Sequence, residues 1–187
     1  MAKQEQYDRL GVALKWAAKL HQGQFREGDH PLPYIAHPME VLVSLRYVGG
    51  VTDENLLIAA VLHDTVEEGG TTHERIRERF GVPVADLVRE LTRYEPTPEE
   101  TQGLSPGQIW RVRSELLLAE IAKMSSPAQA VKLADRLSNL REAFRSKKGK
   151  KLERYVSQSR KILEIVPAAV NPGLWSAISE TIRASDG

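Results

Sequence analysis

The sequence predicts an all-α fold, and three observations support this. Apolar residues recur at helical spacing along nearly the whole chain, and no segment keeps the strict apolar–polar alternation that is typical of a strand. Proline, glycine and capping residues lie where the helical patterns begin and end. The chain has 187 residues, 41% of them hydrophobic, which is enough for one compact domain with a real core. We therefore expect a single helical bundle over residues 1–187.

Five helices are expected in the first half of the chain. Their expected ranges are 7–20, 39–47, 54–68, a short helix ending at 80, and 83–93. Between the first two, residues 22–33 are charged and rich in glycine and proline, which predicts a loop. Pro38 suits the first position of the second helix, and Asp53 can cap the third. The run Thr71-Thr72-His73-Glu74 fits a capping box for the fourth, and Pro83 opens the fifth.

Four more helices are expected in the second half, after a long loop. Residues 94–107 hold three prolines and two glycines, which predicts a flexible loop that can serve as a lid or an insertion. The helices that follow are expected over 108–124, 128–144, 152–165 and 172–184. Ser126-Pro127 and Asn171-Pro172 are typical cap-plus-proline starts, and residues 146–151 form a basic turn between two of these helices.

Composition and charge narrow the classes of function. The formal net charge is +1, from 26 Lys and Arg against 25 Asp and Glu, so no global field favours nucleic acid or an anionic membrane as a partner. There is no cysteine, which excludes disulfides and thiolate sites, so a metal must be held by His, Asp or Glu. The first ten residues have no apolar stretch of the kind found in a signal peptide, and no segment has transmembrane length. We therefore expect a cytoplasmic protein, and a homo-oligomer is possible.

A pair of charged groups ends the most apolar helical segment. His63 and Asp64 follow the run at 57–62, and Glu67 and Glu68 follow them at a spacing of four residues. Buried charges need a partner or a metal, and helix geometry would place these four groups as two adjacent rows on one side. Such a group can hold a divalent cation and leave a carboxylate for proton transfer.

Three further segments carry polar groups of the same kind. Lys132, Asp135 and Asn139 share one face of an otherwise apolar helical segment, where Asp135 can supply an oxygen ligand and the other two can hold a phosphate or a base. His37 lies directly before Pro38, and Arg26 lies in the glycine-containing loop. Taken singly, each has an ordinary structural reading as a cap, a local ion pair or a solvated helix end. The three remaining histidines, which nothing pairs with a second ligand, are read as structural or solvated: His21, His30 and His73.

Together, these segments resemble the hydrolase domain of RelA/SpoT-type alarmone enzymes, which belongs to the HD phosphohydrolase superfamily. The resemblance rests on four segments in the same order, covers roughly residues 10–160, and leaves the C-terminal helices to complete the bundle. The segments are Gly23-Gln24-Phe25-Arg26, Pro33-Tyr34-Ile35-Ala36-His37-Pro38, Leu62-His63-Asp64-Thr65-Val66-Glu67-Glu68 and Val131-Lys132-Leu133-Ala134-Asp135-Arg136-Leu137-Ser138-Asn139-Leu140. The chain has no room for a synthetase domain, so it is similar to a stand-alone small alarmone hydrolase.

The resemblance implies a role for each matching residue. The implied ligands of one manganese ion are His37, His63, Asp64 and Asp135. The implied catalytic acids are Glu67 and Glu68, and the implied substrate contacts are Arg26, Asn139 and Tyr155, to which Lys132 is added from its place on the helix. The chain departs from the family where Glu68 replaces an aspartate, where Glu27 stands in place of a frequent lysine, and in a longer loop over 27–32.

The implied reaction is hydrolysis of the 3′-pyrophosphate of ppGpp to give GDP and pyrophosphate. A bound metal lowers the pKa of a water molecule and neutralises phosphoryl charge, Glu67 lies nearest that water, and Arg26 with Lys132 counters the pyrophosphate charge. Two alternatives stay open from the sequence. One is an HD-type nucleotidase or phosphatase on another nucleotide, such as ppApp or NADPH, and the other is an antitoxin-like, non-catalytic partner of an alarmone synthetase.

Overall fold

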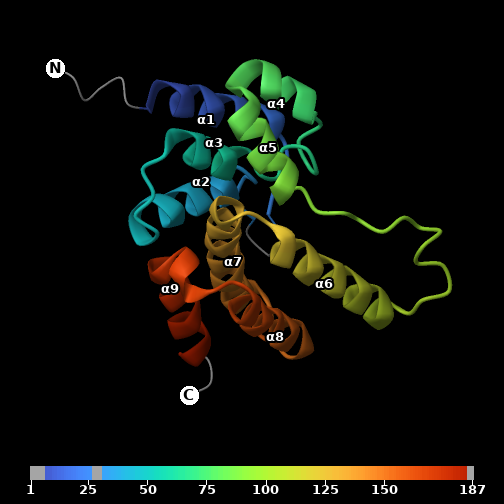
Figure 1. Cartoon of the computed structure of the whole chain (residues 1–187). Coiled ribbons are helices and arrows are strands. Elements are labelled where there is room, and N and C mark those ends of the chain that lie inside the picture. The colour runs from blue at the N-terminus through green and yellow to red at the C-terminus, as the bar shows by residue number, and fades with distance from the viewer. Residues whose placement is uncertain (1–6, 27–30, 185–187) are drawn as a thin grey trace.

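The fold is all-helical, as predicted, in a computed structural model that describes residues 7–26 and 31–184 (Figure 1). Within these residues the only pairing of extended backbone is an isolated bridge between Phe25 and Pro33. The helices, in chain order, are α1 (Asp8–Leu20), α2 (Ala36–Val43), the π-helix η2 (Ser44–Val48), α3 (Glu54–Leu62), α4 (His73–Phe80), α5 (Val82–Leu91), α6 (Pro106–Lys123), α7 (Ser126–Ser146), α8 (Lys150–Ile165), the 3₁₀-helix η3 (Ala168–Val170) and α9 (Pro172–Arg183). Along the described part of the chain, no helix is both long enough and apolar enough to cross a membrane.

Two helices, α3 and α7, form the interior. Every residue of α3 from Leu56 to Leu62 is buried, because this segment is apolar on all sides and packs against α1, α2, α5 and α7. Helix α7 passes through the middle of the molecule and is covered by α2, α5, α8 and α9 (Figure 1). The polar end of α3 therefore meets the side of α7 inside the bundle.

Caps and glycines explain where several helices begin. The Asp53 carboxylate accepts a hydrogen bond from the Leu56 N–H at 2.9 Å, as predicted. Helix α6 begins with a capping box between Ser105 and Gln108. Helix α9 begins at Asn171, whose side chain also donates to the Gly49 carbonyl at 2.9 Å. A Cβ at Gly173 would lie 2.2 Å from the Val48 carbonyl oxygen, so only glycine permits this close approach of α9 to η2.

Several of the predicted boundaries are wrong. The second helix begins at Ala36, so Pro38 is its third residue rather than its first, and its last part is the π-helix η2. The helix expected over 54–68 ends at Leu62, because residues 63–68 form turns in which the His63 ring and the Thr65 hydroxyl bond to carbonyls three residues back. Glu67 and Glu68 therefore do not continue the rows of an α-helix. The fourth helix is capped by Thr72, which accepts from the Arg75 N–H, so Thr71 and Glu74 form no capping box. The N-cap of α7 is Ser125 rather than Ser126.

Candidate metal centre

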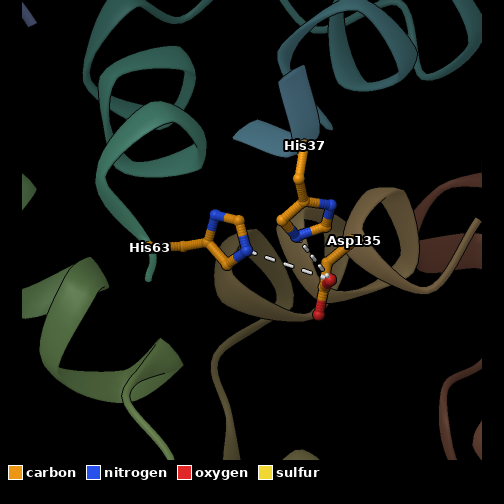
Figure 2. A group of neighbouring side chains, drawn as sticks. All are labelled: His37, His63 and Asp135. Atoms are coloured by element: carbon orange, nitrogen blue, oxygen red, sulfur yellow. Dashed lines mark ion pairs between the residues drawn. The ribbon is translucent and has the colours of Figure 1, made fainter. Parts of the chain in front are cut away.

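Three helices bring the predicted metal ligands together. His37 lies in the first turn of α2, His63 and Asp64 directly follow α3, and Asp135 lies in the middle of α7. The His37 Nε2 lies 3.4 Å from Asp64 Oδ2 and 3.4 Å from Asp135 Oδ1. The His63 Nε2 lies 3.0 Å from Asp64 Oδ1 and 3.9 Å from Asp135 Oδ1. Both imidazole rings point toward the Asp135 carboxylate (Figure 2).

Hydrogen bonds outside the cluster orient both histidines. The His63 Nδ1 donates to the Ala60 carbonyl at 2.8 Å, and the His37 Nδ1 lies 3.1 Å from the Ser138 hydroxyl. Ser138 donates in turn to Glu40 at 2.7 Å, so its oxygen accepts from His37. With Nδ1 of each ring engaged, both Nε2 atoms face the centre, which is how metal-binding histidines are held.

The cluster fits a divalent metal. One ligand atom from each of His37, His63 and Asp135 lies within 4.8 Å of the others, and all three residues are buried. The His63 Nε2 is buried and makes no hydrogen bond, which is costly for a polar atom unless an ion completes its coordination. Asp64 contacts both histidines and adds a second carboxylate. Two imidazoles and two carboxylates suit a first-row divalent ion, but this donor set does not select one metal.

Neighbouring groups set the charge of the two aspartates. Burial alone would raise the pKa of Asp135, but Lys132, whose Nζ lies 3.0 Å away, and the two histidines hold that pKa far below its usual range. Burial likewise opposes charge on Asp64, yet His63 and His37 hold its pKa well below the ordinary value. Tyr34 donates to Asp64 at 2.8 Å. Both carboxylates are therefore ionised and ready to bind a cation.

His37 carries a proton when no metal is bound. Burial disfavours the imidazolium, but hydrogen bonds and charge from Asp135 and Asp64 outweigh it and raise the pKa of His37 to about 9. This proton has to leave before Nε2 can bind a metal.

The two predicted catalytic acids lie in different environments. Glu67 is mostly buried, and both of its oxygens contact Arg93, at 2.8 Å from the backbone N–H and at 3.0 Å from Nε. Burial, followed by the charge of Asp64, raises the pKa of Glu67. Glu68 is exposed, and its carboxylate has no hydrogen bond or ion pair to another described residue.

The predicted substrate residues line two adjoining cavities beside the cluster. The first cavity, of about 240 Å³, is bordered by Arg26, Asn139 and Tyr155. The second, of about 290 Å³, is bordered by Asp135 and Lys132 and shares Asn139 and Tyr155 with the first. The Asn139 side-chain amide donates a hydrogen bond to Asp135, and its oxygen accepts one from the Arg26 guanidinium at 3.5 Å. All four predicted substrate residues thus line these two cavities, and the second cavity also reaches Asp135 of the cluster.

The second cavity also holds cationic and aromatic residues that the sequence analysis did not assign. Arg93, Arg113 and Arg136 add positive charge, and Trp110 adds an aromatic wall. Arg136 does not pair with Asp135, but donates to Gln158 at 2.8 Å and lies over the Tyr155 ring. Arg136 directly follows Asp135, Arg93 lies just after α5, and Trp110 and Arg113 lie in α6, so no motif in the sequence marks these residues as a set.

Two further residues of the cluster had a signal in the sequence. Tyr34 and Ser138 lie within the quoted segments, three residues from His37 and from Asp135 respectively, and each contacts a predicted ligand.

The structural reading of His21 agrees with its burial and with its bond of 2.7 Å to Gln24, and His73 bonds to Thr92. Glu27 and His30 lie outside the described residues.

Comparisons with known proteins agree with this geometry. The family described as HD domain matches residues 13–165. A protein of Xenopus tropicalis with the name guanosine-3′,5′-bis(diphosphate) 3′-pyrophosphohydrolase MESH1 is 38% identical over 133 residues, which are 71% of this chain and 68% of that protein. The Homo sapiens protein of the same name is 39% identical over 138 residues, which are 73% of this chain and 70% of that protein.

A solved structure is similar over nearly the whole length. It is described as "A metazoan ortholog of SpoT hydrolyzes ppGpp and plays a role in starvation responses", and it superimposes with a TM-score of 0.81 at 28% identity, covering 95% of this chain and 96% of that one. The likeness thus includes the helices after residue 165. This chain belongs to the HD-domain family and, within it, to the relatives of the MESH1 pyrophosphohydrolases.

Proposed function

We propose that this protein is a metal-dependent guanosine-3′,5′-bis(diphosphate) 3′-pyrophosphohydrolase, which converts ppGpp and water into GDP and pyrophosphate. One observation carries the proposal. His37, His63 and Asp135 converge in a buried cluster with an open histidine nitrogen, and Asp64 contacts both histidines, in a chain whose relatives carry this activity in their names. Pure binding of a partner protein does not require such a cluster.

The reaction assigns a task to each part of the cleft. Water attacks the phosphorus bonded to the 3′-oxygen, the bond between them breaks, the hydroxyl ends on pyrophosphate, and a proton passes to the 3′-oxygen. A divalent ion, which we propose to be manganese, would be held by the four ligands and would lower the pKa of the water and neutralise phosphoryl charge. Glu67 is proposed to take the proton from the water, since burial raises its pKa toward the range useful for a base.

The remaining residues bind the nucleotide in this proposal. Arg26 and Lys132 supply positive charge next to Asn139, at the boundary of the two cavities. Tyr155 offers an aromatic face, over which Arg136 and Lys147 lie at 5.6 and 5.3 Å from the ring centroid. Glu68, whose side chain is exposed, is proposed as the second acid.

Product analysis tests the proposed reaction. The purified protein is incubated with manganese and with ppGpp, ppApp or NADPH in parallel, and the products are identified. We expect GDP and pyrophosphate from ppGpp, and no turnover after complete chelation. Turnover of ppApp or NADPH without turnover of ppGpp would assign the site to another nucleotide, and full activity in a chelated sample would contradict the metal dependence.

A further inference from the structure

Three consecutive residues after α5 connect Glu67 to α6. Arg93 contacts Glu67, the Tyr94 N–H donates to Glu120 of α6 at 2.9 Å, and Glu95 pairs with Arg113 of α6. Glu95 also lies 3.8 Å from Arg93 Nε, so acidic and basic side chains alternate from Glu67 to Arg113. Residues 93–95 thus touch the proposed catalytic acid on one side and a long helix on the other.

The contact between Arg93 and Glu67 constrains the orientation of the carboxylate. Oε1 accepts from the Arg93 backbone N–H and Oε2 lies against the guanidinium, so both oxygens are held at once. A two-point contact of this kind fixes the plane of a carboxylate as well as its position. The Glu67 side chain is only 18% exposed, so its interaction with Arg93 is less screened than that of a surface pair.

The place of Arg93 in the cleft fits a role in the reaction. Arg93 borders the same cavity as Lys132 and Asp135, and Lys132 and Asp64 act electrostatically on Glu67. The Arg93 side chain is 48% exposed, however, so an ordinary ion pair that only holds the loop is the alternative to test.

We propose that Arg93 is a positioning residue, which fixes the Glu67 carboxylate at the edge of the metal cluster and ties its orientation to α6 through residues 93–95. The proposal rests on the catalytic role proposed above for Glu67. A misplacement of about 1 Å at a reacting group can cost about 100-fold in rate, so a loss of orientation at Glu67 would act on kcat. The Arg93 backbone N–H remains in every variant, so removal of the guanidinium should lower kcat by about 10- to 100-fold rather than abolish activity.

The experiment compares four variants with the wild-type protein in manganese and ppGpp. They are Arg93→Gln, Glu67→Gln, the double variant, and Arg89→Gln. Arg89 is the matched control, because it pairs with Asp86 on the surface of α5 and is 54% exposed. kcat, KM, bound manganese and Tm are measured for each. We expect Arg93→Gln to lower kcat with KM within about two-fold, to keep its metal and Tm, and to have no further effect on kcat in the Glu67→Gln background.

Other outcomes would overturn the proposal. If kcat of Arg93→Gln is unchanged, the contact with Glu67 is an ordinary ion pair. If KM rises while kcat stays the same, Arg93 is a substrate-binding group. If the two losses in kcat add up in the double variant, Arg93 acts independently of Glu67. If Glu67→Gln itself is fully active, the role of Glu67 fails as well. If only the proposal for Arg93 is wrong, Glu67→Gln is still impaired while Arg93→Gln is not, so the two failures can be told apart. Should Arg93→Gln not fold, Arg93→Lys keeps the charge without the planar fork, and a kcat loss without a KM change is still expected.

Discussion

His63 illustrates how one side chain is prepared for a ligand. Its Nδ1 bonds to the Ala60 carbonyl at 2.8 Å, and its Nε2 is buried without a hydrogen bond. The bond to Ala60 is possible because the helix has just ended and the ring turns back on the last α-helical turn. The same local feature thus ends α3 and orients a proposed metal ligand.

Replacement of His63 should remove the metal. His63→Ala loses one of four proposed ligands, so we expect bound manganese and ppGpp turnover both to fall to background. His73→Ala is the control, since the one hydrogen bond described for the His73 ring goes to Thr92, which is not a proposed ligand. Metal content by elemental analysis and turnover are measured together. A His63→Ala protein that keeps wild-type manganese would show that His63 is not a ligand.

Replacement of Glu67 should separate chemistry from binding. Glu67→Gln keeps the shape of the side chain and removes the charge, so kcat should fall by about 10²- to 10⁴-fold with bound metal unchanged. Glu68→Gln should cost less, because the Glu68 side chain is exposed and its carboxylate has no hydrogen bond or ion pair to another described residue. Steady-state kinetics and metal analysis of both variants provide the measurement. A rise in KM at constant kcat for Glu67→Gln would instead make Glu67 a binding group.

At the scale of elements, the sequence predicts where the helices lie, but it predicts less well where a helix with polar residues at its end stops. The apolar pattern of α3 and the Asp53 cap are local, so the start and the burial of this helix follow from the sequence. Its end at Leu62 does not, because the turns over 63–68 depend on bonds from His63 and Thr65 that compete with helix geometry. Arg93 was missed for a similar reason, since only the folded chain brings it to Glu67. The motif residues, in contrast, were singled out by their order in the chain and by their resemblance to a known family, and the structure brings His37, His63 and Asp135 together.

Substitution by alanine should have opposite effects on stability at two glycines, because Gly173 lies at the contact of α9 with η2 and Gly11 lies in open space on α1. Gly173→Ala would place a methyl group 2.2 Å from the Val48 carbonyl oxygen, so we expect a loss of about 1–3 kcal/mol in the free energy of unfolding. Gly11→Ala, in α1, meets nothing within 4 Å and should add about 0.5–1 kcal/mol through helix propensity. Denaturant unfolding of both variants gives the comparison. If Gly173→Ala is as stable as the wild type, α9 is not held against η2 in solution.

At the scale of the whole molecule, charge balance links metal binding to pH. The buried cluster without metal contains two ionised aspartates, Lys132 and a protonated His37, so positive and negative charges nearly cancel. The raised pKa of His37 stabilises the metal-free fold below about pH 6.5, and this contribution is lost as the pH rises through about 9. A metal ion has to replace the His37 proton.

Manganese affinity should therefore increase with pH. Below pH 9, each unit of pH should tighten binding about ten-fold, with release of about one proton per ion. Titration calorimetry at pH 6.5 and 7.5, in two buffers of different ionisation enthalpy, measures both quantities. Equal dissociation constants at the two pH values, with no proton released, would show that His37 is already neutral in the metal-free protein.

The proposed metal ligands come from α2, from the end of α3 and from α7, and this order along the chain has a consequence for synthesis. When the first half of the protein has been synthesised, the chain contains His37, His63 and Asp64, but Asp135 has not yet been added. The complete ligand set exists only after α7 has emerged and entered the bundle between α2, α3 and α9. Under the proposed function, the metal would therefore bind after α7 has packed, and would stabilise a bundle that has already formed rather than start its folding.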